Sequence, residues 1–224
     1  MKKFTILLIL ALAAAPLLKA QEGVKIGLRF APIVAFTSIT NEAGNDLPGT
    51  TVSSRLGYSY GLMATYGFTD NYGIYTGVHI VNKGFSRTDV GDSLTSTQKV
   101  TATTVEIPIA LRGRSNEIGN GIYINGLFGI SLDVKAAYKN EFTGSNPVTG
   151  ELGNGTTKDL ALINPLTASF LFGAGADWYV DRVGTFNFGL IFHQGLVNLN
   201  SQKNFNNLEV IKVSYLSLDL AYLF

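Results

Sequence analysis

The chain has 224 residues, with no cysteine, 15% charged residues, 11% aromatic residues and a formal net charge of +1. Few charges and many aromatics argue against disorder, and the near-neutral charge gives no basic surface for nucleic acid. The lack of cysteine excludes a disulfide scaffold, a cysteine-type zinc site, a thiol nucleophile and a lipoprotein anchor. A single domain is expected at this length.

Residues 1–20 have the pattern of a secretory signal peptide. Lys2 and Lys3 precede a short apolar run at 4–18, and small residues follow toward a cleavage point after residue 20. The alternative is a retained membrane helix, which is disfavoured because the run is short and no second apolar stretch of spanning length follows. We therefore expect an exported domain, 21–224, with 14 basic and 16 acidic residues and a formal charge of −2.

Beyond the signal peptide, hydrophobicity repeats every two residues, which is the period of a β-strand. In the first run, 24–31, bulky apolar side chains alternate with Lys25, Gly27, Arg29 and Ala31. The second run, 55–68, alternates in the same way with glycine, serine, threonine, methionine and arginine. A soluble sandwich would usually carry many charges on its exposed face, so this pattern favours a membrane barrel whose apolar face contacts lipid.

Six further segments are long enough for the ~9–11 residues of a tilted spanning strand. They lie at 72–84, 99–112, 121–135, 162–180, 185–197 and 208–224. The sequence thus predicts an all-β fold, an eight-stranded antiparallel up-and-down transmembrane β-barrel of the smallest outer-membrane size class. Residues 139–158 are rich in Gly, Asn, Thr and Pro without alternation, so we expect a loop there; ten strands is the alternative if this segment holds a hairpin.

The connections alternate between short and long. Three short turns fall at 69–71, 113–120 and 181–184, and four longer polar loops at 38–54, 85–98, 136–161 and 198–207. Short turns face the periplasm in outer-membrane barrels, and long loops face outward. Aromatic residues beside the short turns and at the chain's end predict a membrane girdle at the periplasmic interface: Phe68, Tyr72, Trp178, Phe186, Tyr222 and Phe224.

The inward face is expected to hold charged side chains of both signs in paired networks, because an unpaired buried charge is costly. Strand parity assigns twelve residues to this barrel-interior polar network: Lys25, Arg29, Arg55, His79, Lys83, Glu106, Arg112, Asp133, Lys135, Asp177, His193 and Asp219. An eight-stranded barrel is just wide enough to be filled by side chains, which argues against an open pore. We therefore prefer the interpretation that the interior is a polar core whose side chains pair with one another.

Catalysis is the main rival to that interpretation. A grouping of His193, Asp177 and Ser169 on neighbouring strands is conceivable, but neither His79 nor His193 is followed two residues later by a serine. That spacing is the arrangement used by lipid A deacylase barrels. The sequence has no phosphate-binding glycine loop or metal-ligand spacing, so no cofactor, metal or catalytic residue is predicted.

Several short motifs resemble the PorT-like outer-membrane β-barrel family of Bacteroidetes. Thr-Val-Glu-Ile-Pro-Ile-Ala-Leu at 104–111 looks like its Glu-Ile-Pro strand, with Ile109 where the family usually has leucine. Residues 194–198 resemble its Gly-Leu-x-Asn, and 82–85 its Lys-Gly step. The alternating apolar end of the chain, with Phe224 last, resembles the signal read by the barrel-assembly machinery. The resemblance implies an eight-stranded outer-membrane barrel and, for some members, a link to type IX secretion.

We therefore expect a non-enzymatic protein of the outer membrane with a structural, adhesive or secretion-accessory role. Its expected partners are outer-membrane lipid, the barrel-assembly machinery during insertion, and envelope or secretion-system proteins that contact its loops or its periplasmic face. The alternatives are a lipid-modifying barrel enzyme, a soluble lipocalin-like ligand-binding barrel, and a narrow channel. A lipocalin-like barrel would have an apolar interior, whereas the parity here places charge inside and apolar side chains outside.

Overall fold

The computed structural model of the chain describes residues 23–41, 44–45, 49–90, 95–145, 152–158, 164–199 and 209–224, so the expected signal peptide lies outside the described residues. One antiparallel sheet is formed by β1 (Val24–Asn41), β2 (Thr50–Gly67), β3 (Tyr72–Val90), β4 (Thr95–Arg114), β5 (Ile122–Ser145), β6 (Leu152–Thr157), β7 (Leu166–Val180), β8 (Gly184–Gly195) and β9 (Glu209–Leu223). Across the described ranges, no helix is long and apolar enough to cross a membrane.

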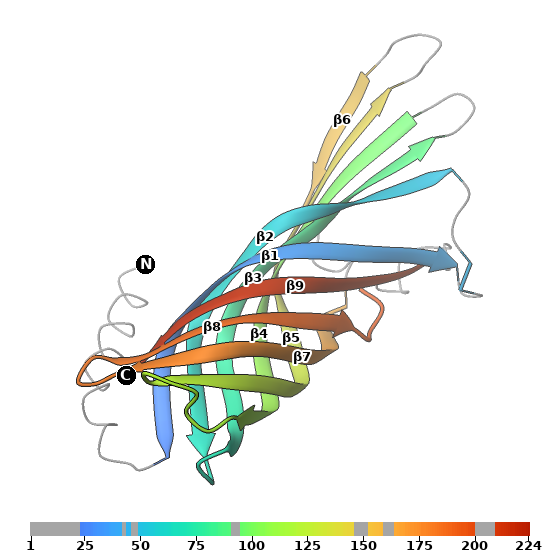
Figure 1. Ribbon diagram of the computed structural model, residues 1–224. Coiled ribbons are helices and arrows are strands. Elements are labelled where there is room, and N and C mark those ends of the chain that lie inside the picture. The colour runs from blue at the N-terminus through green and yellow to red at the C-terminus, as the bar shows by residue number, and fades with distance from the viewer. Residues whose placement is uncertain are drawn as a thin grey trace.

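Eight of these strands close into a ring. Neighbours in sequence pair from β1 to β5, β5 pairs with β7, and β7 to β9 pair in order. The ring closes because β1 also pairs with β9, over the range from Gly27 opposite Leu223 to Asn41 opposite Glu209. Figure 1 shows these strands tilted around a common axis. The predicted eight-stranded antiparallel barrel is confirmed.

The ninth strand lies in the segment that was expected to be a loop. β5 continues ten residues beyond the predicted end at Lys135, to Ser145, and β6 pairs with its last six residues. The hairpin was not visible in the alternation because its two paired segments, 140–145 and 152–157, are mostly polar or glycine residues without a period of two. Within the part of the chain that the structure describes, β6 pairs only with β5 and adds no strand to the ring, so the ten-stranded alternative is also wrong.

The two ends of the barrel differ in construction. At one end, here called the short-turn end, β2–β3, β4–β5 and β7–β8 are joined by the turns at 68–71, 115–121 and 181–183. Gly121 (φ 77°) and Arg182 (φ 60°) adopt the left-handed conformation that such tight turns need. The opposite end, here called the tall end, carries the other connections, the end of β1 and the start of β9. The predicted long loop at 85–98 is wrong, because β3 runs to Val90 and β4 begins at Thr95.

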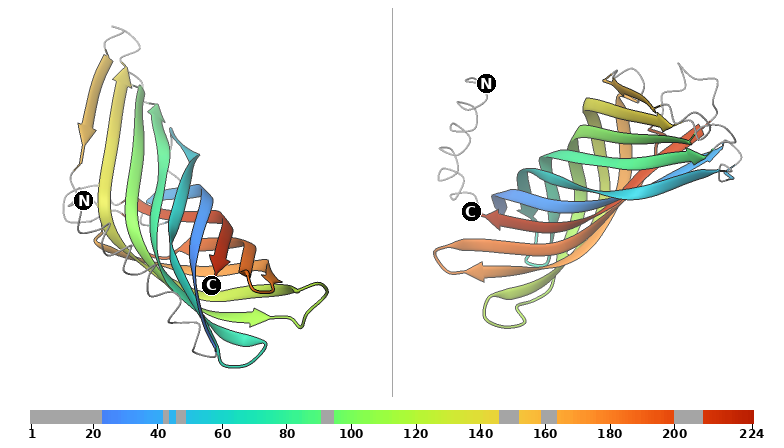
Figure 2. Two further views of the ribbon diagram at one scale, coloured as in Figure 1. Left: turned by 90° about the vertical axis from the view of Figure 1, so that its left-hand side faces the viewer. Right: turned by 90° about the horizontal axis from the view of Figure 1, so that it is seen from above.

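The barrel wall splits near the tall end. Pairing between β1 and β2 stops at Ala35 opposite Arg55, and pairing between β5 and β7 stops at Val134 opposite Leu166. Beyond those points β2, β3, β4, β5 and β6 continue together as a separate sheet, here called the tall wall. It rises past the other strands in Figure 1, and the left view of Figure 2 shows the β5–β6 edge at its tip. β1 stays paired with β9 alone.

The faces of the barrel follow the predicted parity. Bulky apolar side chains are exposed on the outer face, as for Leu62 (40% exposed), Phe128 (63%) and Leu190 (52%). The interior is layered, with one buried apolar cluster of β1, β3, β4 and β9 residues that includes Ile33, and another around Leu171. Buried charged residues, among them Glu106, form a third group. The interior is thus filled by side chains.

Candidate functional site

The site with the most concentrated chemistry is a group of buried charged and aromatic residues inside the barrel, here called the charged layer. Its members come from six strands: Arg29, His79, Lys83, Glu106, Asp133, His193, Tyr215 and Asp219. Each has at most 4% of its surface exposed. Their inward orientation follows from the two-residue period of the strands that carry them.

Arg29 of β1 and Asp219 of β9 form the first pair of the charged layer. Arg29 Nε donates to Asp219 Oδ2 at 2.5 Å and Nη2 donates to Oδ1 at 2.7 Å, a bidentate geometry typical of strong charge-assisted bonds. Arg29 Nη1 also donates to Ser59 Oγ at 2.8 Å, and Ser217 Oγ donates to Asp219 Oδ1 at 2.7 Å. The pair is therefore fully engaged with polar partners on three strands.

Glu106 of β4 is the centre of the second group. His79 Nδ1 lies 3.4 Å from its Oε1, and His193 Nδ1 lies 3.4 Å from its Oε2. The Tyr215 hydroxyl donates to Oε2, and the Tyr215 ring stacks on His193 with centroids 4.1 Å apart. One carboxylate thus joins side chains of β3, β8 and β9 across the interior.

Lys83 and Asp133 complete the charged layer. Lys83 Nζ donates to Asp133 Oδ2 at 2.6 Å and lies 5.2 Å from the centroid of the Tyr215 ring, within cation–π range. The layer holds two cations, two imidazoles and three carboxylates. Each cation pairs with a carboxylate and both imidazoles lie beside Glu106, so the layer is a mixed network rather than a field of one sign.

Six buried polar atoms around the charged layer have no hydrogen-bond partner among the described residues: His79 Nε2, Thr104 Oγ1, Ser131 Oγ, Asp133 Oδ1, His193 Nδ1 and His193 Nε2. Buried polar groups are normally paired with protein or with internal water. Their clustering on adjacent strands marks the most polar part of the interior. Within the described ranges, no three His, Asp or Glu side chains come together as a metal site.

The other residues assigned to the interior lie elsewhere. Arg112 and Asp177 form an ion pair at the short-turn end, where Lys25 lies as well. Arg55 donates to Val100 O at 3.3 Å and Thr101 Oγ1 at 3.1 Å on β4, apart from the charged layer. Lys135 is half-buried on β5, opposite Thr104. The twelve residues therefore divide between the charged layer, the short-turn end and separate positions on the wall.

Two residues that matter for these sites, Tyr215 and Arg114, were not among the twelve predicted interior residues. Tyr215 shares the parity of Asp219 on β9 and is 1% exposed, but aromatic residues were assigned to the outer face or the girdle. Arg114 shares the parity of Glu106 and Arg112 on β4, but the predicted strand stopped at residue 112. Extending the predicted strand by one step of the same alternation would have identified Arg114, whereas Tyr215 needed only to be assigned by its parity.

The predicted girdle residues gather at the short-turn end. Phe68 (52% exposed), Tyr72 (62%) and Trp178 (48%) are exposed beside the turns. The rings of Trp178 and Phe186 lie 5.9 Å apart, those of Phe186 and Tyr222 5.2 Å, and those of Tyr222 and Phe224 5.1 Å. Four of the six aromatics thus form one continuous row across β7, β8 and β9.

The arrangement offers little to a catalytic reaction. Asp177 accepts hydrogen bonds from Arg112, Asn125 and Asn187, and none from His193. The hypothetical grouping of His193, Asp177 and Ser169 is therefore not joined by hydrogen bonds among the described residues. The charged layer is also shielded from solvent by the surrounding side chains, with Glu106 at 0% exposure.

A closed ring of eight antiparallel strands, apolar outside and charged within, defines a protein of the outer membrane. Residues 19–201 match the family model described as outer membrane protein beta-barrel domain, and the chain belongs to that family. The outer-membrane location is thereby confirmed, and the soluble lipocalin-like alternative is wrong. No curated protein matches the sequence.

Several solved structures of outer-membrane proteins are similar to the chain. OprG from Pseudomonas aeruginosa is 15% identical, with a TM-score of 0.47, and the match covers 90% of this chain and 96% of that one. Ail from Yersinia pestis is 15% identical, with a TM-score of 0.37, and the match covers 91% of this chain and 100% of that one. Neisserial surface protein A is 11% identical, with a TM-score of 0.41, and the match covers 90% of this chain and 98% of that one.

Proposed function

We propose that this outer-membrane barrel is closed and non-enzymatic, and that it presents the tall wall to a protein partner outside the cell. The orientation follows from the rule that short turns lie on the periplasmic side. The short-turn end, with its aromatic row, then faces the periplasm, and the tall wall faces outward. The expected adhesive role rests on this orientation, with a structural or secretion-accessory role as its rival.

The observation that carries the proposal is the change in the outer face of the tall wall. On β4 the outward residues Val105, Ile107 and Ile109 give way at residue 103 to threonine and lysine. β4 continues for nine residues, 95–103, which at ~3.3 Å per residue extends about 30 Å past the apolar band. Such a hydrophilic sheet contributes nothing to membrane insertion, so it is available for contacts with other molecules.

The surface of the tall wall has the features of a protein-binding sheet. Lys139 donates to Glu141 at 2.5 Å on the exposed face of β5, and this hydrogen bond lowers the pKa of the Glu141 carboxyl below its ordinary value. Among the described residues β6 pairs on one side only, and edge strands of this kind are used in strand addition. Polar side chains and such an edge strand together favour recognition by backbone pairing.

The filled interior supports a closed barrel rather than a channel. The buried apolar clusters contain large side chains, such as Phe85 and Tyr75, and the charged layer is paired. Eight-stranded barrels have an interior that side chains can fill, and this one follows that rule. A solute would have to displace several buried ion pairs in order to cross.

The same proposal includes the family branch, the signal peptide, the roles of the interior and girdle residues, and the partners. The Glu-Ile-Pro motif at 106–108 supports a PorT-like branch of the family, and the apolar run at 4–18 supports a signal peptide. We propose the charged layer as the stabilising polar network of the barrel and the aromatic row as its periplasmic girdle. The barrel-assembly machinery and envelope or secretion-system proteins remain the proposed partners.

Site-specific photo-crosslinking in living cells tests the proposal. A photoreactive amino acid is placed at Thr97 or Thr143, on the tall wall. It is expected to form covalent adducts with the partner protein, and the amount of adduct should rise with the amount of partner present. The same amino acid at Leu62, which faces the lipid, is the matched control and should give none. Adducts at Asp181 of the third short turn, with none at either tall-wall position, would overturn the proposal in favour of a periplasmic secretion accessory.

A further inference from the structure

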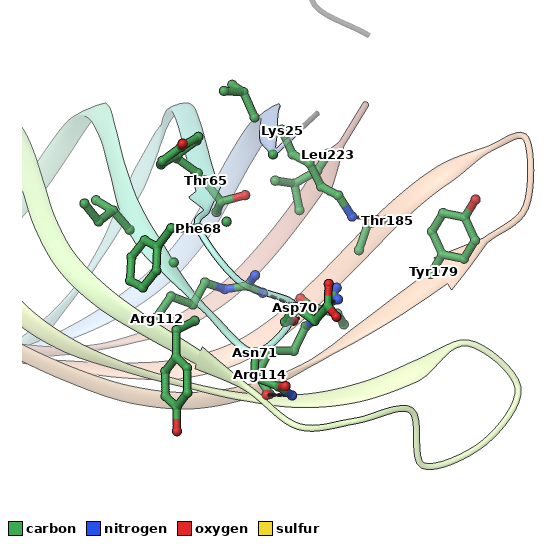
Figure 3. Close-up of a pocket in the computed structure, with 18 of the residues that line it drawn as sticks. Lys25, Thr65, Phe68, Asp70, Asn71, Arg112, Arg114, Tyr179, Thr185 and Leu223 are labelled. Atoms are coloured by element: carbon green, nitrogen blue, oxygen red, sulfur yellow. Dashed lines mark hydrogen bonds and ion pairs between the residues drawn. The ribbon is translucent and has the colours of Figure 1, made fainter. Parts of the chain in front are cut away.

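A cavity of about 720 Å³ opens at the short-turn end of the barrel. Its walls come from the start of β1, the first and third short turns, and the ends of β4, β7 and β9. Figure 3 shows Lys25 and Thr185 on one side of it and Arg112 and Arg114 on another. Nothing in the proposed adhesive role uses this cavity, which lies at the opposite end from the tall wall.

Positive charge predominates in the lining. The lining holds four cations, on Lys25, Arg112, Arg114 and Arg182, and two side-chain carboxylates, on Asp70 and Asp177. Asp177 is already engaged, because it accepts hydrogen bonds from Arg112, Asn125 and Asn187. Arg182 lies near its neighbour Asp181 at the exposed rim. Two cations, Lys25 and Arg114, are left without a carboxylate partner among the described residues.

The partners of those two cations are weak. Lys25 Nζ lies 3.4 Å from Thr185 Oγ1 and 5.8 Å from the centroid of the Tyr179 ring. Arg114 Nη2 donates to Asp70 O at 3.3 Å, and its guanidinium lies 4.3 Å from the centroid of the Tyr123 ring. The charges of Arg114 and Arg112 repel the Lys25 ammonium, and the charge of Asp177 attracts it. An anion between them would relieve this repulsion and accept the remaining N–H donors.

We propose that this cavity binds a phosphate-bearing organic ligand. Donors reach it from β1, β4 and β8, and a tetrahedral phosphate offers oxygens in several directions, whereas a carboxylate offers two in one plane. Arginine and lysine together are suited to that geometry. The cavity of about 720 Å³ is larger than a single phosphate ion and leaves room for an organic group beside it. Such a group can belong to a phospholipid headgroup or to a soluble phosphomonoester.

Binding of glycerol 3-phosphate to the full-length protein in neutral-lipid nanodiscs tests the proposal by calorimetry. We expect saturable binding that weakens with salt and that falls about tenfold in Lys25→Gln and in Arg114→Gln, since each change removes a hydrogen bond to a charged group. Lys139→Gln, on the tall wall, is the matched control and should bind as the wild type does. Heat-modifiable gel mobility shows that each variant is folded.

Native mass spectrometry of the same samples distinguishes the two sources of phosphate. A phospholipid that is retained by the wild type and lost from Lys25→Gln and Arg114→Gln would identify a lipid headgroup. Saturable glycerol 3-phosphate binding without a retained lipid would identify a soluble ligand. The proposal is overturned if neither ligand binds, or if both folded variants bind as tightly as the wild type.

Discussion

Arg29 on the first strand of the ring and Asp219 on the last form a bidentate ion pair across the seam that closes the barrel, with Nε–Oδ2 and Nη2–Oδ1 distances of 2.5 and 2.7 Å. Both residues are 3% exposed. The two residues are 190 positions apart in sequence, and only ring closure brings them together. The pair therefore stabilises the one strand pairing that joins the two ends of the chain.

Removing one partner of this pair should be strongly destabilising. Asp219→Ala leaves the Arg29 guanidinium buried without its carboxylate, and breaking a buried pair in this way costs about 3–5 kcal/mol. The free energy of unfolding is measurable by urea titration in lipid vesicles, with the fluorescence of Trp178, the single tryptophan, as the probe. The double variant Arg29→Met/Asp219→Leu should recover much of the loss, because it leaves no unpaired charge. An Asp219→Ala protein as stable as the wild type would contradict this account.

Gly77 on β3 leaves room for the imidazole of His79. A Cβ at that position would lie 2.5 Å from the carbonyl oxygen of Leu62 and 2.7 Å from His79 Nε2. Gly77→Ala should therefore lower the free energy of unfolding by about 1–3 kcal/mol, as overpacking does. Gly153→Ala is the matched control, because a Cβ there meets no atom within 4 Å. Equal urea midpoints for the two variants would contradict this prediction, because they would show that the strands around Gly77 accommodate a methyl group at little cost.

The filled interior predicts that the barrel does not conduct ions. Planar bilayers containing folded protein should show no steps in current, since buried apolar clusters and ion pairs occupy the interior. The measurement needs a sample whose gel mobility changes with heat, so that a silent trace reports on folded barrels. Reproducible open-channel steps from that sample would favour the channel alternative.

The membrane-spanning part of the fold could be predicted from sequence because each position there has one of two environments. Leu28 and Phe30 face lipid while Arg29 faces the interior, and that contrast is visible as a period of two. The tall wall was only partly predicted, because its positions lack that contrast between two environments. Both faces of β4 at 95–99 are polar, so its strand character comes from backbone pairing with β3 and β5 rather than from alternation.

The pairing within the charged layer could not be predicted, although most of its members were. Parity places Glu106 and His193 inside the barrel, but their contact depends on the stagger of strands around the ring. The cavity at the short-turn end depends likewise on turn positions, which bring Lys25 of β1 near Arg114 of β4. Inward-facing apolar residues such as Ile33 and Phe85 also depart from the simple rule of polar side chains inside.

The accessibility of single introduced cysteines tests the orientation of the barrel in the membrane, because the chain has no cysteine of its own. Three positions define the topology: Thr97 on the tall wall, Leu62 on the lipid face and Asp181 in the third short turn. In intact cells, a membrane-impermeant maleimide should label Thr97→Cys alone. Asp181→Cys should react only after the outer membrane is permeabilised, and Leu62→Cys should stay unreactive until the barrel is denatured. Labelling of Asp181→Cys in intact cells while Thr97→Cys is protected would contradict the orientation, and rapid labelling of folded Leu62→Cys would contradict the membrane barrel itself.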